Sequence, residues 1–148
     1  MNEKAAEIIK EWEYPCPYDA YNFKGKKNGY LLNREIWGTE LFCLICDGEV
    51  IGYVACQFGD NNLWVGWSFA PELCGKGDGV LFIKKCVDEI RRVKSYDGSI
   101  YLRVAAWNER AKKAYTKAGF EYVETIIDEI AGTNNPEDFW VMKHVEAI

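Results

Sequence analysis

Hydrophobic and polar positions recur along this chain with two periods, and each change of period marks an expected element. Residues 4–12 carry apolar side chains at helical spacing, with Asn2 in front as a candidate cap. The short apolar runs Leu41–Cys46 and Glu49–Phe58 are typical of strands. The Asp47-Gly48 pair between them favours a tight turn with positive φ, so the two runs should form a hairpin.

A third strand and a helix follow, joined by a turn with three alternate glycines. Leu63–Phe69 is the expected strand, and residues 80–90 return to helical spacing. Gly75, Gly77 and Gly79 lie between them. Glycines leave backbone N–H groups uncovered, and the positive end of the helix dipole favours an anion there. This stretch therefore predicts a site for a phosphate-bearing ligand.

The last third of the chain predicts a strand, a helix and two closing strands. Ile100–Ala105 is the expected strand. Asn108 can cap the helix that follows, and Gly119 supplies a left-handed stop at its end. Residues 122–130 and 139–145 favour two further strands. The order of elements predicts one α+β domain without internal repeats.

Composition and charge narrow the class of protein. A chain of 148 residues can bury one full core but is too short for two ordinary domains. The formal charge of −5 argues against a nucleic-acid surface, which needs a basic stripe, and it suits a cationic substrate. No apolar run approaches the roughly 20 residues of a membrane span. The N-terminus lacks the apolar segment of a secretion signal, so we expect a cytoplasmic protein with no membrane partner.

Six cysteines raise the question of a metal or redox site. Cys43 and Cys46 have C-x-x-C spacing, but they lie in an expected strand, where residues three apart point to opposite faces. A second such pair does not occur, and the only histidine, His144, is far away in the sequence. We therefore predict no metal site and interpret the cysteines as buried free thiols in a reducing compartment.

A second informative stretch begins at Asn108. Ala111, Ala114, Tyr115 and Ala118 share one face of the expected helix. Three of these four are small, which lets another backbone or a slender ligand come close, and Tyr115 carries the only polar tip. Taken alone, a buried aromatic residue beside alanines is more often part of the core than a catalyst.

Together, the glycine turn and this helix resemble two motifs of the GNAT superfamily of N-acetyltransferases. The family's helix pattern, N-x-x-A-x-x-x-Y-x-K-x-G-F, is met in full by residues 108–120. Its turn pattern, Q/R-x-x-G-x-G/A, is met at Gly77 and Gly79, but Cys74 stands at the leading position. The resemblance runs from about Leu41 to the C-terminus. It implies a GNAT-like, three-layer α+β fold with a mixed central sheet of about six strands and flanking helices.

The resemblance also assigns roles to parts of a single domain, residues 1–148. Residues 1–40 would lie on the substrate side, and residues 41–148 would form the acetyl-CoA-binding core. Residues 14–23 contain two prolines, which prevent the first helix from continuing. These residues would form an aromatic loop that lines the substrate site or packs over that helix. For residues 31–37 a short helix and an irregular arm both stay open. Because few residues precede the first helix, we expect the first family strand to be missing.

The implied function is transfer of an acetyl group from acetyl-CoA to a primary amine, by direct attack on the thioester. Tyr115 resembles the general acid that protonates the departing CoA thiolate. In such folds the strand before the glycine turn splays from its neighbour and pairs with the pantetheine arm, which places Trp67 and Phe69 there. An N–H from Phe69 or Ala70 would face the thioester carbonyl. Asn108 would bond the pantetheine amide, although helix capping explains it equally well.

The glycine turn would hold the pyrophosphate of acetyl-CoA. The residues expected at it are Cys74, Gly75, Lys76, Gly77, Asp78, Gly79 and Val80. Cys74 replaces the family's Gln or Arg, and Asp78 places a carboxylate among the phosphate-binding amides, so weakened CoA binding is an open alternative. The general base stays unassigned among Glu72, Asp60, Glu40 and a water relay.

Two other functions compete with the enzyme. A non-catalytic acyl-CoA-binding or regulatory module would keep the same fold. A dinucleotide-binding protein would need G-x-G-x-x-G, but here the third glycine comes one residue early, at Gly79. The acceptor is expected to be a small-molecule or peptide amine whose identity stays open. A homodimer is the assembly that the resemblance suggests.

Overall fold

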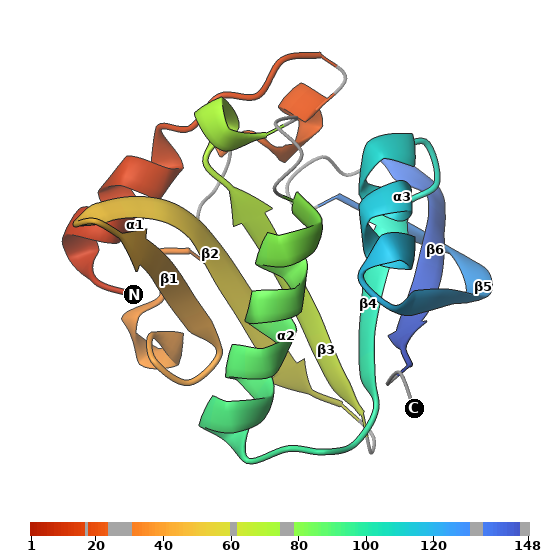
Figure 1. Cartoon of the computed structure of the whole chain (residues 1–148). Helices are drawn as coiled ribbons and strands as arrows, with labels where there is room; N and C mark the ends of the chain where they lie inside the picture. Colours follow the sequence, from red (N-terminus) through yellow and green to blue (C-terminus); the bar gives the residue numbers. More distant parts are fainter. Residues whose placement is uncertain (17, 24–30, 60–61, 75–78, 131–134, 146–148) are drawn as a thin grey trace. The chain divides into compact units, whose positions relative to one another are not determined.

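The computed structural model of the chain describes residues 1–16, 18–23, 31–59, 62–74, 79–130 and 135–145. The α-helices in these ranges are α1 (Glu3–Lys10), α2 (Gly79–Lys94) and α3 (Glu109–Lys117) (Figure 1). The strands are β1 (Leu41–Cys46), β2 (Glu49–Phe58), β3 (Leu63–Phe69), β4 (Ile100–Ala105), β5 (Phe120–Glu129) and β6 (Pro136–His144). None of the helices is long and apolar enough to cross a membrane, within the residues described.

The strands form one mixed six-stranded sheet in the order β1-β2-β3-β4-β6-β5. β1 and β2 pair antiparallel, as do β4 and β6, whereas β3 and β4 are parallel. This confirms the predicted α+β fold with a mixed sheet of six strands. The first four strands have the predicted bounds, while β5 begins at Phe120 and β6 at Pro136, earlier than the pattern indicated.

The chain divides into two compact units, each made of several segments. The first unit contains Met1–Ala55, Trp67–Cys74 and Glu129–Asn135. The second unit contains Cys56–Gly66, Gly75–Asp128 and Pro136–Ile148. The predicted site residues are therefore described unit by unit below.

The first unit has a hydrophobic core built on α1. The helix is capped as predicted, because Asn2 Oδ1 accepts a hydrogen bond from the Ala5 N–H at 2.8 Å. The buried side chains of this core come from α1, the loops after it, β1 and the residue that follows β3. They are Ala6, Ile9, Trp12, Leu31, Leu41 and Ala70.

The hairpin between β1 and β2 has the predicted turn. Asp47 and Gly48 both have positive φ, 52° and 81°, which a two-residue type I′ turn requires. Before β1, the described residues hold β structure only as a bridge between Trp37 and Leu41, which agrees with a missing first family strand. The alternative left open for residues 31–37 resolves to a short 3-10 helix, Arg34–Ile36, capped by the Asn33 side chain.

The second unit is organised around α2 and the paired strands β4 and β6. Ile83, Val87 and Ile90 are buried at the predicted positions of α2, together with Cys86. α3 begins after Asn108 and ends at Lys117, and Gly119 has a φ of 103°, which confirms the left-handed stop. Within this unit α2 and α3 are in contact.

The six cysteines are free, as predicted. Cys56 and Cys86 are buried and Cys43 and Cys74 are half-buried. Cys16 and Cys46 are exposed, so the expectation of burial is wrong for these two; Cys46 ends β1 beside the turn, where its side chain meets solvent. Within the described ranges, no group of three or more His, Cys, Asp or Glu side chains could hold a metal ion.

Candidate functional site

The predicted site residues are distributed over both units. Trp67, Phe69, Ala70 and Cys74 belong to the first unit, at the end of β3 and the 3-10 turn Pro71–Leu73 after it. Those in the second unit are Gly79, Val80, Asn108 and Tyr115. Four members of the predicted pyrophosphate turn lie outside the described residues: Gly75, Lys76, Gly77 and Asp78.

The start of α2 is compatible with a phosphate-bearing ligand. The helix begins at Gly79 and runs for 16 residues, so its N–H groups and dipole are those of a full helix. A Cβ added at Gly79 would meet no heavy atom of the described residues within 4 Å. Among the described residues, nothing covers the backbone on that side, and the residues present fit the pyrophosphate expected there.

Asn108 lies directly before α3 and is 8% exposed. Its Oδ1 accepts a hydrogen bond from the Ala111 N–H at 3.1 Å, and its own N–H donates to the Ala105 carbonyl at 2.9 Å. The helix-cap role predicted for this side chain is therefore confirmed. Its second predicted role, toward the pantetheine amide, stays a prediction.

Tyr115 is half-buried on the same face of α3 as Ala111 and Ala118. Its ring packs against Phe120, the first residue of β5, with the ring centroids 6.0 Å apart. This contact fixes the ring and leaves part of the side chain at the surface of the second unit. The general-acid role of its hydroxyl stays a prediction.

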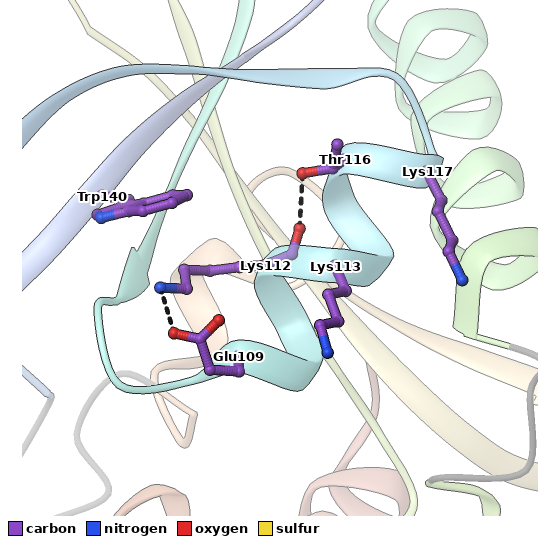
Figure 2. Close-up of a pocket in the computed structure, with 6 residues that line it drawn as sticks. All are labelled: Glu109, Lys112, Lys113, Thr116, Lys117 and Trp140. Carbon is purple, nitrogen blue, oxygen red and sulfur yellow. Dashed lines mark hydrogen bonds and ion pairs between the residues drawn. The ribbon is translucent and has the colours of Figure 1, made fainter.

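The opposite face of α3 carries a shallow pocket of about 280 Å³, shown in Figure 2. Its lining residues are Glu109, Lys112, Lys113, Thr116, Lys117 and Trp140. The helix positions follow i, i+3, i+4, i+7 spacing, which turns them away from Ala111 and Tyr115. The pocket is therefore separate from the face predicted to meet acetyl-CoA.

Lys112 is a buried cation that the sequence did not single out. It is 8% exposed, and its Nζ lies 2.7 Å from the Ala106 carbonyl oxygen and 2.7 Å from a Glu109 carboxylate oxygen. The same Nζ lies 4.0 Å from the centre of the Trp140 ring. Figure 2 shows Lys112 extending toward Trp140, whereas Lys113 and Lys117 extend away from it. The charge is satisfied internally, which indicates a structural role.

In the first unit, the last residue of β3 is held from two sides. The Phe69 carbonyl accepts a hydrogen bond from the Tyr14 hydroxyl at 2.5 Å. The Ala70 N–H donates to the Ile51 carbonyl in β2 at 2.8 Å. Of the two N–H groups predicted to face the thioester, that of Ala70 is therefore engaged within the protein.

Polar side chains surround the Tyr14 hydroxyl. Burial raises the pKa of Tyr14, and the neighbouring Tyr53 and Cys74 raise it further, whereas a hydrogen bond with Ser68 lowers it. Burial also raises the pKa of Tyr53, whose hydroxyl lies 3.4 Å from Ser68 Oγ. Both phenols are therefore protonated at neutral pH. The sequence pointed to the aromatic loop but gave no signal for this contact with β3.

Cys74 is turned toward the protein backbone. Its sulfur lies 3.6 Å from the Ala70 carbonyl oxygen and 3.9 Å from that of Phe69. The thiol at the leading position of the turn motif thus donates to the end of β3, where a Gln or Arg would have a longer reach.

Two expectations concern parts of the site that the structure does not test. The parallel ladder of β3 and β4 includes Leu63 with Ile100 and Trp64 with Tyr101, at the start of both strands. The predicted splay concerns Trp67 and Phe69 in the other unit and stays a prediction.

Among the candidate bases, Glu72 is exposed and its charge contributes to the raised pKa of Tyr14, whereas Glu40 is half-buried. Asp60 lies outside the described residues.

Comparison with known proteins adds a family and a set of similar folds. The family model described as the acetyltransferase (GNAT) family matches residues 6–120. The spermidine N-acetyltransferase from Vibrio cholerae in complex with CoA and spermine is 19% identical with a TM-score of 0.74, over 97% of this chain and 90% of that one. An acetyltransferase of the GNAT family from Bacillus anthracis is 18% identical with a TM-score of 0.57, over 72% of this chain and 66% of that one.

Some of the other alignments are shorter. A point mutant of the Vibrio cholerae enzyme is 23% identical with a TM-score of 0.60, over 71% of this chain. The chain spans 64% of the length of that mutant and 65% of a chimera of the same enzyme. No curated protein sequence matches the chain significantly.

Proposed function

Because the chain belongs to the GNAT family of acetyltransferases, we propose that it transfers an acetyl group from acetyl-CoA to a primary amine. The observation that carries the proposal is the arrangement of the second unit. There α2 begins at Gly79, and the neighbouring α3 begins at its cap, Asn108, and carries the half-buried Tyr115. These are the two motifs that the family uses for acetyl-CoA.

In this proposal the backbone holds the co-substrate. The N–H groups at the start of α2, at Gly79 and Val80, bind the pyrophosphate together with those of residues 75–78. Trp67 and Phe69 lie along the pantetheine arm, and the Asn108 amide binds its carbonyl. The engaged Ala70 N–H leaves this site with Phe69 as the donor toward the thioester oxygen, a type of contact that contributes on the order of 3 kcal/mol in other enzymes.

Acetyl-CoA supplies the acetyl group as a thioester, and the amine takes it with release of the CoA thiol. The N–C bond forms as the C–S bond breaks, and the sulfur needs a proton as it leaves. Tyr115 donates that proton, because a phenol with a pKa near 10 is protonated at neutral pH. The amine must lose a proton before it attacks, and Glu72, Glu40, Asp60 or a water relay accepts it.

A cationic amine is the acceptor class that fits best. The chain has a formal charge of −5, which attracts cations to its surface. A protein of similar fold is a spermidine N-acetyltransferase whose structure contains spermine. Polyamines therefore come first in a panel of acceptors, followed by amino acids, aminoglycosides and peptides with a free N-terminus.

The test is release of CoA in the presence of an amine. The protein is incubated with acetyl-CoA, each amine in turn and a thiol reagent, with the protein omitted as the control. We expect amine-dependent CoA release with at least one acceptor and an acetylated product of the matching mass. Thermal stabilisation by acetyl-CoA without turnover on any amine would indicate the alternative, a non-catalytic acyl-CoA-binding or regulatory module.

A further inference from the structure

Tyr14 connects the aromatic loop after α1 to the end of β3. Its hydroxyl donates to the carbonyl of Phe69, a residue 55 positions further along the chain. Its backbone N–H donates to Asn22 Oδ1 at 2.7 Å, which fixes Tyr14 within the loop. Its ring packs against the core cluster of the first unit, whose members include Trp12 and Ala70. The side chain is thus held at its backbone, its ring and its hydroxyl.

The direction of these bonds locates the Tyr14 hydroxyl on one edge of β3. In an extended strand, the N–H and C=O of one residue point to the same edge, and those of the next residue point to the other. The Ala70 N–H points to Ile51 in β2. The carbonyl and the N–H of Phe69 therefore face the other edge, and the Tyr14 hydroxyl lies there.

The Phe69 carbonyl and the Ala70 N–H belong to the same peptide group. Tyr14 holds this group at its oxygen, and Ile51 holds it at its nitrogen. The Cys74 thiol contacts the same oxygen at 3.9 Å and the next carbonyl, that of Ala70, at 3.6 Å. Rotation of this peptide group is therefore restricted at both ends, at the point where β3 stops.

We propose that Tyr14 is a positioning residue for acetyl transfer, which binds the Phe69 carbonyl and so fixes the backbone at the end of β3 toward the thioester. The inference rests on the proposed function. It explains why a phenol is used at this position, since a ring alone would fill the same space against the core. In this proposal the Cys74 thiol supports the same Phe69 carbonyl and does not contact the pyrophosphate.

The surroundings of the hydroxyl suit a permanent donor. Burial is the main reason that the pKa of Tyr14 is raised, and Tyr53, Cys74 and Glu72 add to it. The phenol therefore keeps its proton at the alkaline pH values at which amines become nucleophilic. For the same reason it does not serve as the base that deprotonates the amine.

The first test is Tyr14→Phe, which keeps the ring against the core and removes the hydroxyl. We expect kcat to fall by about tenfold or more, because small misplacements of a reacting group cost up to about a hundredfold in rate. The dissociation constant for acetyl-CoA and the thermal midpoint should stay close to those of the wild type. Tyr122→Phe is the matched control. It removes the hydroxyl of an exposed tyrosine, which forms a hydrogen bond with the Thr125 hydroxyl within β5.

A second pair of variants keeps the inference testable should Tyr14→Phe fold poorly. Asn22→Ala removes the acceptor of the Tyr14 N–H, whereas Asn22→Asp keeps an oxygen in the same place. We expect kcat to fall in the first variant and to be largely restored in the second. If the contact served stability alone, Asn22→Ala would lower the thermal midpoint, but kcat per folded protein would be the same in Asn22→Ala and Asn22→Asp.

The activities of the wild type and of Tyr14→Phe distinguish the positioning role of Tyr14 from the proposed acetyl transfer. An active wild type with an equally active, folded Tyr14→Phe variant would overturn the inference and leave the proposed function in place. A wild type that turns over none of the amines would overturn both. A loss of kcat that follows only the loss of folded protein would also contradict the positioning role.

Discussion

The side-chain oxygen of Asn108 accepts a hydrogen bond from the Ala111 N–H, with 3.1 Å between oxygen and nitrogen. This bond satisfies one of the N–H groups that every helix leaves without a partner in its first turn. The family motif assigns the same Asn to the pantetheine arm. A single side chain would then both start α3 and bind acetyl-CoA, through different atoms of its amide.

Two substitutions separate these roles of Asn108. Asn108→Ala removes the cap and the amide, and we expect it to lower the free energy of unfolding by about 1 kcal/mol. Asn108→Asp keeps an oxygen for the Ala111 N–H, so stability should be close to that of the wild type. Both variants lack the amide donor and should bind acetyl-CoA about tenfold more weakly. Urea unfolding and calorimetric titration with acetyl-CoA measure the two effects. Wild-type affinity in Asn108→Asp would restrict Asn108 to capping.

Tyr115→Phe tests the general acid. The ring would still pack on Phe120, so the affinity for acetyl-CoA should not change. We expect kcat to fall by about a hundredfold at neutral pH, because proton donation to a leaving group contributes a factor of that order. Tyr101→Phe is the control in the same unit, where the Tyr101 ring packs against Trp64.

The leaving group gives a sharper version of the Tyr115 experiment. An acyl donor that releases an aromatic thiol of low pKa needs little protonation as it departs. The loss caused by Tyr115→Phe should therefore shrink with such a donor. An equal loss with both donors would indicate that Tyr115 positions the substrate instead.

Much of the fold could be predicted from the sequence because its signals are local. The turn at Asp47-Gly48 needs positive φ, the cap at Asn108 needs a short polar side chain, and the stop at Gly119 needs a residue without a Cβ; all three were predicted and are present. Strand and helix periods depend only on neighbouring residues, which explains why most element bounds agree. β5 and β6 begin at Phe120 and Pro136, earlier than the pattern indicated, because the period of apolar residues does not mark the first residues of either strand.

The site was less predictable because its contacts are distant in sequence. The bond from Tyr14 to Phe69 spans 55 residues, and neither residue type indicates it. Lys112 has the sequence context of a solvated surface lysine, but it is buried because its amine reaches the Ala106 carbonyl and the Trp140 ring. The sequence motifs predicted the helices α2 and α3, whereas the hydrogen bonds that orient the end of β3 depend on tertiary structure.

Lys112 supports the packing of α3, and its loss should be measurable as stability. Lys112→Ala removes the charged hydrogen bond to Ala106 and the contact with Trp140, and we expect it to lower the free energy of unfolding by about 2 kcal/mol. Lys113→Ala, one position along and exposed, should change it by less than about 0.5 kcal/mol. Affinity for acetyl-CoA should be unaffected, since this face of α3 is opposite Tyr115. Equal effects of both variants on urea unfolding would contradict the assignment.

Cys86 should make the protein less stable as the pH rises. Its thiol is buried in α2, and burial raises its pKa from the ordinary value of 9.0 to about 12. Above pH 9 the thiol of the unfolded chain loses its proton while that of the folded chain keeps it. The unfolded state then binds fewer protons, so stability falls with pH until the folded thiol also ionises. The contribution of the protonated Cys86 thiol to the free energy of unfolding is complete below pH 9 and is lost between pH 9 and about 12.

Urea unfolding as a function of pH measures this effect. Between about pH 8 and about pH 10, the part of the loss due to Cys86 should be about 1 kcal/mol. Cys86→Ala lowers stability by a constant amount through its cavity, but it removes the titrating group, so its stability should fall less steeply with pH than that of the wild type. Cys46→Ala removes an exposed thiol and should keep the wild-type slope. Burial also raises the pKa of the Tyr14 phenol, which lowers stability at alkaline pH in the same way. Some loss of stability with rising pH therefore remains in every variant. Parallel curves for the wild type and Cys86→Ala would show that the Cys86 thiol ionises equally in the folded and unfolded states.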